Sequence, residues 1–229
     1  MGYYSYLFFF IPVLIFTLFA QLSVDSTFNK FNKVANRRRM TGADAARLIL
    51  QANGLHDVRI EQVAGNLTDH FDPRENVIRL SESVYGVASI AAVGVAAHEA
   101  GHAVQYAVGY GPIKLRSAIV GVTQFASKWS ILILMLGFLI QVEALAMVGF
   151  WLYAVVAFFQ FVTVPVEFNA SRRALAALSE GGALDNEELK GAKKVLSAAA
   201  MTYVAALASA LVQLLRLWLM ITGGSRRRR

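Results

Sequence analysis

The chain has 229 residues, 56% of them hydrophobic, and a mean hydropathy of +0.49, values that exclude an ordinary soluble domain and indicate a membrane protein. Its net charge of +7 does not indicate nucleic-acid binding, because the basic residues cluster beside apolar segments, where anionic lipid headgroups are the expected partner. Cysteine is absent, so disulfides and thiolate ligands are excluded and His, Asp and Glu remain as metal ligands.

The first segment, residues 3–22, is apolar and uncharged, with the length of about 20 residues that a membrane span needs. A signal peptide would begin with basic residues and end at a small-residue cleavage site, and both features are missing here. We therefore expect an uncleaved anchor. A basic cluster follows and is either a contact with lipid headgroups or a solvated linker; it comprises Lys30, Lys33, Arg37, Arg38 and Arg39.

Residues 41–54 have the pattern of an amphipathic helix that opens a soluble part. Thr41 is the expected N-cap, Asp44 completes a capping box, and Gly54 ends the helix. From residue 57 to residue 80 the apolar period changes to two, which predicts a small hairpin sheet. Its last strand, residues 76–80, is expected either to pair with an extended substrate or to be a structural edge strand.

His70 lies within this predicted sheet, in the sequence LTDHF. It could be a metal ligand or a hydrogen-bond donor to the transition state, or it could be a surface residue beside the Asp72-Pro73 turn.

The segment AAVGVAAHEAGHAVQYA, residues 91–107, carries the residues on which the functional interpretation depends. No Pro interrupts the chain between Val87 and Val108, so a helix is expected. His98 and His102 are four residues apart, so they share a helical face and can bind one divalent ion. Glu99 can then act as general base on a water at that ion, as in zinc hydrolases with the pattern H-E-x-x-H.

Two further apolar helices, residues 118–140 and 144–166, are separated by a short turn and predict a transmembrane hairpin. Pro165 suits the first turn of a new helix, which would place Glu167 near a helix start. Because two crossings return the chain to the starting side of the membrane, Glu167 can meet His98 and His102. We therefore expect Glu167 to be the third ligand of one zinc ion per chain.

The last part of the chain predicts a long helix that begins with a second capping box, formed by Asp185 and Glu188, and ends as a fourth span before the terminal arginines. The expected fold is a mainly α membrane protein, with about four transmembrane helices and a small α+β soluble zinc-peptidase part. The expected segments are an anchor, a soluble metallopeptidase part, a transmembrane hairpin, a third-ligand helix and a C-terminal span with its basic tail, at 1–24, 25–117, 118–166, 167–195 and 196–229.

The basic residues near these spans also predict an orientation in the cell membrane. Twelve lie on the side of the metal site, and four arginines, Arg226 to Arg229, lie on the other side. By the positive-inside rule the metal site faces the cytoplasm. The twelve residues are Lys30, Lys33, Arg37, Arg38, Arg39, Lys114, Arg116, Arg172, Arg173, Lys190, Lys193 and Lys194.

Three quoted stretches resemble the YugP-type membrane zinc metallopeptidases of bacteria: GNLTDHFDPRENVIRLSESVY, AVGVAAHEAGHAVQYA and PVEFNASRRALAAL. A looser similarity links the chain to HtpX-like peptidases. The resemblance implies a multi-pass membrane peptidase with His98 and His102 as ligands, Glu99 as base and Glu167 as third ligand. Two residues depart from the expected patterns, because Asn169 and Ser171 stand where acids are expected, which puts in doubt how firmly the histidines are oriented.

The sequence thus predicts a membrane-embedded zinc endopeptidase that hydrolyses peptide bonds of membrane-associated or misfolded proteins. His70 and either Arg172 or Arg173 are candidate donors to the oxyanion. The expected partners are a polypeptide substrate and the lipid bilayer, and a second copy or another membrane protein could pack against the small residues of the last span. The alternatives are an intramembrane protease of the site-2 type and a non-catalytic scaffold in which a fourth ligand, such as His70, closes a structural zinc site.

Overall fold

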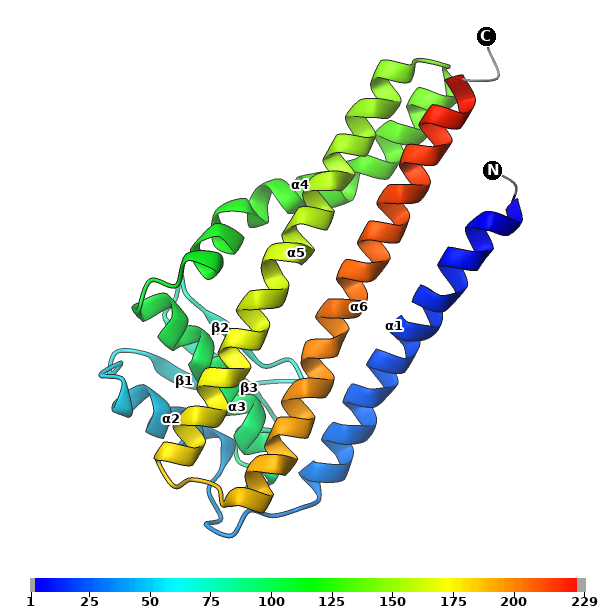
Figure 1. Cartoon of the computed structure of the whole chain (residues 1–229). Coiled ribbons are helices and arrows are strands. Elements are labelled where there is room, and N and C mark those ends of the chain that lie inside the picture. Colours follow the sequence, from blue (N-terminus) through cyan, green and yellow to red (C-terminus); the bar gives the residue numbers. More distant parts are fainter. Residues whose placement is uncertain (1–2, 226–229) are drawn as a thin grey trace. The chain divides into compact units, whose positions relative to one another are not determined.

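The computed structural model describes the backbone of residues 3–225 and the side chains of residues 10–223. Over this range the chain forms six helices and three strands (Figure 1). In chain order they are α1 (Tyr3–Asn32), α2 (Gly42–Ala52), β1 (Arg59–Val63), β2 (His70–Asp72), β3 (Val77–Ser81), α3 (Ile90–Ala107), α4 (Gly111–Leu139), α5 (Glu143–Glu180) and α6 (Asn186–Ser225). The protein is therefore mainly helical with one small sheet, as expected.

Within the described residues, four helices are long and apolar enough to cross a membrane. They are residues Phe10–Asn32 of α1, all of α4 and α5, and residues Asn186–Gly223 of α6. This confirms the expectation of about four spans. The helix that carries the H-E-x-x-H pattern, α3, is not one of them.

The chain divides into two compact units, which are described separately. The apolar unit contains the residues up to Phe19, Lys114–Pro165 and the residues from Thr202 onward. In it, Gly137 and Gly149 let α4 and α5 approach closely, because a Cβ at either position would overlap backbone atoms of the other helix. Leu134, Phe150 and Leu217 are among the buried residues that pack these helices and α6 together.

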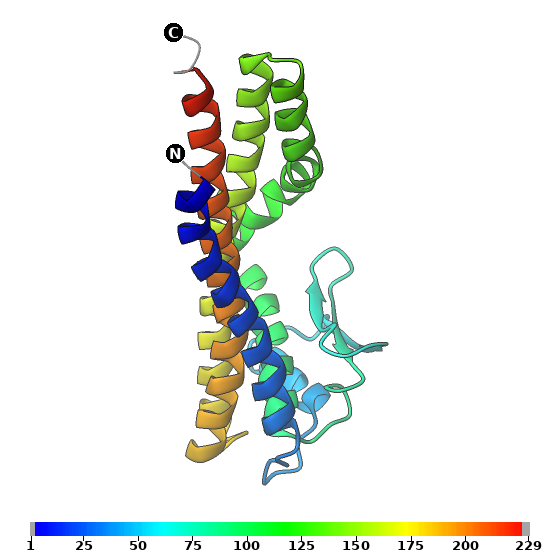
Figure 2. The same cartoon turned by 90° about the vertical axis from the view of Figure 1, so that its right-hand side faces the viewer.

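The site unit contains Ala20–Ile113 and Val166–Met201. Its core packs α2 and α3 against the sheet and against the parts of α5 and α6 that belong to this unit. Figure 2 shows the sheet on one side of α3 and the helical segments on the other. The amphipathic face of α2 is buried in this core through Ala45, Ala46 and Ile49.

The sheet differs from the predicted hairpin in its strand order, which is β1-β3-β2. β3 pairs in parallel with β1 and antiparallel with β2. The expectation that residues 76–80 form an edge or substrate-pairing strand is therefore wrong, because β3 has a neighbour on both sides. Alternation predicts that a strand exists, but strand order is decided by which side chains fill the core, and Val77, Ile78 and Leu80 are fully buried.

The structure confirms both predicted capping boxes, whereas the predicted helix start at Pro165 is wrong. Thr41 and Asp44 form the first box, and at Asp185 the backbone N–H donates to Glu188 while the Glu188 N–H donates to Asp185. Pro165 does not begin a helix but lies inside the 38 residues of α5. An apolar pattern on both sides of a Pro allows the helix to continue at the loss of one backbone hydrogen bond.

Candidate metal centre

The helix α3 is fixed closely against α5 at the position of the metal ligands. Ser89 caps its start by accepting a hydrogen bond from the N–H of Ala92, and the Ala-rich sequence that follows favours a helix. Gly101, three residues after His98, faces the backbone of α5. A Cβ at Gly101 would lie 2.7 Å from the carbonyl oxygen of Ala170, so only glycine permits this distance between the two helices.

Two histidines from α3 and one glutamate from α5 meet at this contact. The Nε2 atom of His98 lies 3.1 Å from Oε2 of Glu167, and the Nε2 atom of His102 lies 3.5 Å from the same oxygen. Glu167 is 1% exposed, so its carboxylate is removed from solvent and directed to the imidazoles. Burial alone would lower the pKa of His102, but the hydrogen bond to Glu167 and the charge of Glu99 outweigh it and raise that pKa.

The distances within this group fit a zinc ion. One donor atom from each of the three residues lies within 4.8 Å of the others. Zinc bonds to imidazole nitrogen and carboxylate oxygen are about 2.1 Å long, so neighbouring ligand atoms of a tetrahedral site are about 3.4 Å apart. The two nitrogen–oxygen distances, 3.1 and 3.5 Å, bracket this value. Among the described residues, no fourth His, Asp or Glu belongs to the group.

The other ring nitrogen of each histidine is hydrogen-bonded to a neutral side chain. Nδ1 of His98 lies 3.1 Å from the hydroxyl of Ser171, and Nδ1 of His102 lies 3.0 Å from Oε1 of Gln105. The Gln105 amide donates both to the carbonyl of Val166 and to Oδ1 of Asn169. With both hydrogens engaged, only its oxygen can face His102, so Nδ1 carries the proton and Nε2 is free to bind metal.

The two departures from the expected patterns therefore lie in the shell that orients the ligands. Ser171 contacts His98 directly. Asn169 acts through Gln105, and its oxygen also accepts a hydrogen bond of 2.8 Å from Nε of Arg173. Two donors fix the orientation of the Asn169 side chain, so a neutral amide at this position holds the arrangement without a carboxylate.

Glu99 lies one residue beyond His98 and is 8% exposed. No side chain among the described residues donates a hydrogen bond to its carboxylate. Asp69 is close enough for the charge of Glu99 to act on it, and burial together with that charge raises the pKa of Asp69. The N–H and the hydroxyl of Ser81 hold the Asp69 carboxylate in place.

The remaining residues predicted from the sequence do not join the metal group. His70 is exposed, and its Nδ1 lies 2.9 Å from the carbonyl oxygen of Thr68. Its neighbours Asp69 and Phe71 point to the opposite side of the strand, where Phe71 contacts Tyr106 of α3. Arg172 is exposed.

Sequence reasoning missed Gln105 and Asp69. Gln105 is fully buried and lies three residues after His102, a spacing that places neighbours on one helical face and was available as a signal. Asp69 had no such signal, because its proximity to Glu99 depends on the strand order of the sheet.

Comparison with known proteins identifies the family. Residues 6–222 match the family described as "Putative neutral zinc metallopeptidase". The chain belongs to this family. It is 45% identical over 219 residues to the "Putative membrane protease YugP" of Bacillus subtilis (strain 168), with 96% of this chain and 97% of the relative covered. No solved structure matches the chain. The protein is therefore a zinc metallopeptidase by family, and its group of His98, His102 and Glu167 is consistent with a zinc site.

Proposed function

We propose that the protein is a membrane-embedded endopeptidase that binds one zinc ion and cleaves membrane-associated or misfolded polypeptides. The observation that carries this proposal is the convergence of His98, His102 and Glu167, with both Nε2 atoms directed to one carboxylate oxygen. Catalytic zinc sites have three protein ligands and an open fourth position, whereas structural sites have four protein ligands. Three donors among the described residues therefore support a catalytic site.

The residues around the metal divide the chemistry between them. Zinc, when bound, supplies a Lewis acid that acidifies a water and polarises the scissile carbonyl. Glu99 accepts the proton of the attacking water and returns it to the leaving amine. Gln105 and Ser171 hold the two imidazoles so that their Nε2 atoms keep facing Glu167. His70 and Arg172, whose side chains are exposed, are the candidate donors to the oxyanion.

Two alternatives have less support. A structural zinc site would need a fourth ligand, and His70, the candidate for that role, is outside the group. An intramembrane protease would carry its motif in a span, but α3 is not among the four candidate spans. The apolar runs that follow α3 also contain no Asp that could serve as the third ligand of such an enzyme.

We further propose that the metal site faces the cytoplasm, on the basis of the distribution of Lys and Arg around the spans. The chain has no cysteine, so one introduced cysteine is a unique label. Glu82→Cys, at an exposed position of the site unit, should react with a membrane-impermeant maleimide only after the cells are opened. Labelling in intact cells would place the site on the outer side.

The catalytic proposal is tested with purified full-length protein in detergent micelles or nanodiscs. Wild type should bind one equivalent of zinc and cleave an unfolded protein substrate, and a chelator should abolish cleavage. Glu99→Gln should keep the zinc and lose cleavage by at least about 100-fold, the contribution of a positioned acid-base group. Glu180→Gln, at an exposed carboxylate far along α5, is the matched control. A Glu99→Gln protein that cleaves at the wild-type rate would refute the proposal.

A further inference from the structure

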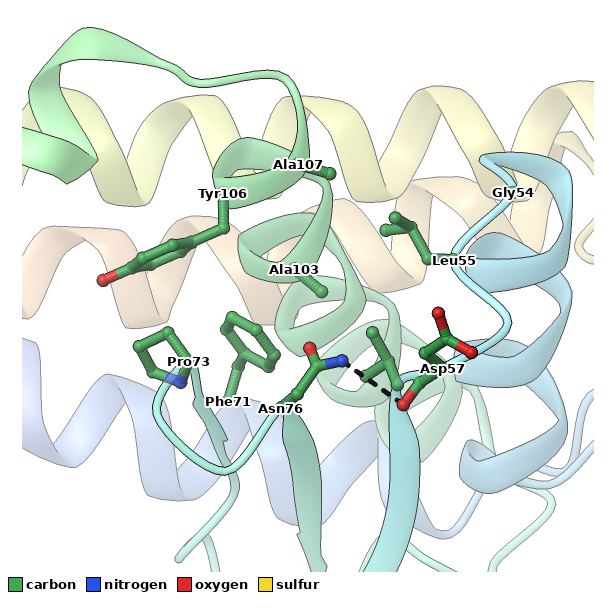
Figure 3. Close-up of a pocket in the computed structure, with 10 residues that line it drawn as sticks. Gly54, Leu55, Asp57, Phe71, Pro73, Asn76, Ala103, Tyr106 and Ala107 are labelled. Carbon is green, nitrogen blue, oxygen red and sulfur yellow. Dashed lines mark hydrogen bonds between the residues drawn. The ribbon is translucent and has the colours of Figure 1, made fainter.

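A cavity of about 330 Å³ lies on the side of α3 that faces the sheet (Figure 3). Ala103, Tyr106 and Ala107 of α3 form one wall, and Phe71 of β2 and Leu55 of the loop before β1 face them. This volume is at the lower end of the range for small-molecule sites, so it suits one long side chain better than a cofactor.

The cavity shares a wall with the metal centre. Tyr106 lies four residues after His102 and seven after Glu99, so all three lie on neighbouring parts of one helical face. The Tyr106 ring packs edge-on against Phe71, with a centroid distance of 5.6 Å. Seven helical residues span about 10 Å, and an extended peptide covers that distance in about three residues. A substrate held at the metal centre could therefore place a nearby side chain in this cavity.

Asp57 and Asn76 each offer a hydrogen-bond acceptor at the cavity. In Figure 3 the Asp57 carboxylate points toward Leu55, while the Tyr106 hydroxyl points away from Asp57. The side-chain nitrogen of Asn76 donates a hydrogen bond of 3.3 Å to the backbone oxygen of Asp57, and the amide oxygen of Asn76 remains able to accept a hydrogen bond from a ligand. This bond also joins the loop before β1 to the turn before β3 and keeps the cavity in shape.

The Asp57 charge is not neutralised within the described residues. No described residue forms a hydrogen bond or salt bridge with its carboxylate, and the nearest Lys or Arg in the sequence, Arg59, is paired with Glu61. A cavity with apolar walls, an aromatic pair and one free carboxylate is complementary to a long aliphatic chain that ends in a cation. A carboxylate or phosphate ligand would be repelled by the same charge.

We propose that this cavity is a substrate subsite that binds a Lys or Arg side chain located two to four residues from the scissile bond. The methylene groups pack between Phe71, Leu55 and Ala103, and the charged end lies beside Asp57 and the amide oxygen of Asn76. The inference deepens the proposed peptidase function and rests on it. The expected polypeptide substrates carry a basic residue at a fixed distance from the cleaved bond.

The experiment uses internally quenched peptides with an uncharged sequence, in which one Lys is moved through the four positions on each side of the cleaved bond. The same peptides with norleucine in place of Lys are the reference, because norleucine keeps the methylene chain without the charge. For wild type, kcat/KM should be about tenfold higher with Lys than with norleucine at one position, the size of a partly exposed charge-assisted contact. This ratio should fall as salt is added.

Variants assign the preference to the cavity. Asp57→Asn should reduce the Lys-to-norleucine ratio to about one, and Asp57→Lys should favour a Glu peptide at the same position by charge reversal. Glu180→Gln, which removes an exposed carboxylate outside the cavity, should keep the wild-type ratio. The proposal is overturned if wild type shows no basic preference, or if Asp57→Asn keeps it while its thermal midpoint is unchanged.

A binding measurement separates failure of the subsite from failure of the peptidase function. Fluorescence anisotropy of the Lys and norleucine peptides on zinc-loaded Glu99→Gln protein should give the same preference and the same loss in a Glu99→Gln, Asp57→Asn double variant. If wild type cleaves no peptide but the binding preference depends on Asp57, the function is wrong and the cavity assignment stands. If cleavage occurs without any dependence on Asp57, the cavity assignment is wrong and the function stands.

Discussion

The two sides of α3 have opposite properties. Toward α5 the helix is closely packed, with Gly101 against Ala170 and Gln105 fully buried. Toward the sheet it borders an open cavity whose polar groups, Asp57 and Asn76, are exposed. A metal ligand has to be held within a few tenths of an ångström, which requires dense packing, whereas a substrate has to enter and leave. The contacts that hold α3 in place therefore lie on its densely packed side, whereas the proposed subsite lies on its accessible side.

The largest expected effect is on the closely packed side, at Glu167, the proposed third ligand. Glu167→Ala removes one of three donors and should weaken zinc binding by more than the roughly 10- to 100-fold typical of residues that only orient a ligand. Zinc content after dialysis and a competitive titration with a chromophoric chelator measure this. A variant that retains one equivalent of zinc at wild-type affinity would mean that Glu167 is not a ligand.

The next largest effects are expected at Gln105 and Ser171, which contact the Nδ1 atoms of His102 and His98, and they should differ in size. Gln105→Ala should lower zinc affinity by roughly 10- to 100-fold, because it removes the acceptor for His102 and the side-chain hydrogen bond that joins α3 to the Val166 carbonyl of α5. Ser171→Ala should cost less, since Ser171 is only half-buried and a water can replace its hydroxyl.

The absorption spectrum of the Co²⁺-substituted protein gives a second readout for this pair. Its ligand-field bands should change in Gln105→Ala even at saturating metal, because the His102 ring is no longer held. Equal zinc affinities and equal spectra for Gln105→Ala and Ser171→Ala would show that a buried hydrogen-bond partner orients its histidine no better than a half-buried one.

A third test compares two glycines of α3. Gly101→Ala places a Cβ 2.7 Å from a backbone oxygen of α5, so the helices must move apart, and overpacking of this kind costs about 1 to 3 kcal/mol. Gly94→Ala is the matched control, because its Cβ would make an ordinary contact of 3.5 Å with Ala192. Thermal unfolding in detergent and zinc affinity should both fall for Gly101→Ala and remain near wild type for Gly94→Ala. Equal behaviour of the two would contradict the close contact.

The smallest expected effect is at the capping box of α2, which is formed by Thr41 and Asp44. The helix α2 packs against α3. Thr41→Ala should destabilise the protein by about 1 kcal/mol, measured as a lower unfolding midpoint. The hydrogen bond from Thr41 lowers the pKa of Asp44 below its ordinary value of 3.8. This stabilisation is therefore fully present above that value and is lost as the pH falls through the lowered pKa. The difference in unfolding midpoint between wild type and Thr41→Ala should shrink in acid. A difference that stays constant with pH would show that the charge of Asp44 does not contribute to the cap.

Local patterns predicted much of the structure. The spacing of His98 and His102, the two capping boxes and the four apolar spans are all encoded within a few neighbouring residues. The placement of Glu167 required only a count of membrane crossings, and the structure brings this residue to the histidines.

Long-range contacts could not be predicted in the same way. The central position of β3 depends on which strand best fills the core, and the proximity of Asp69 to Glu99 follows from that order. The usual position of Pro in the first turn of a helix predicts a helix start at Pro165, but the apolar residues on both sides continue α5 through it. The cavity beside Tyr106 is formed by three segments that are separate in the sequence, so no single stretch indicates it.

The orientation of the Gln105 amide has a further consequence for how the ion is acquired. The acceptors of its two hydrogens, the Val166 carbonyl and Asn169 of α5, are not members of the metal group, so the tautomer of His102 is selected independently of the ion. Uptake then requires little reorganisation of the polypeptide. The exchange of backbone amide hydrogens along α3 should accordingly be nearly the same before and after zinc is added, with association limited by the arrival of the ion.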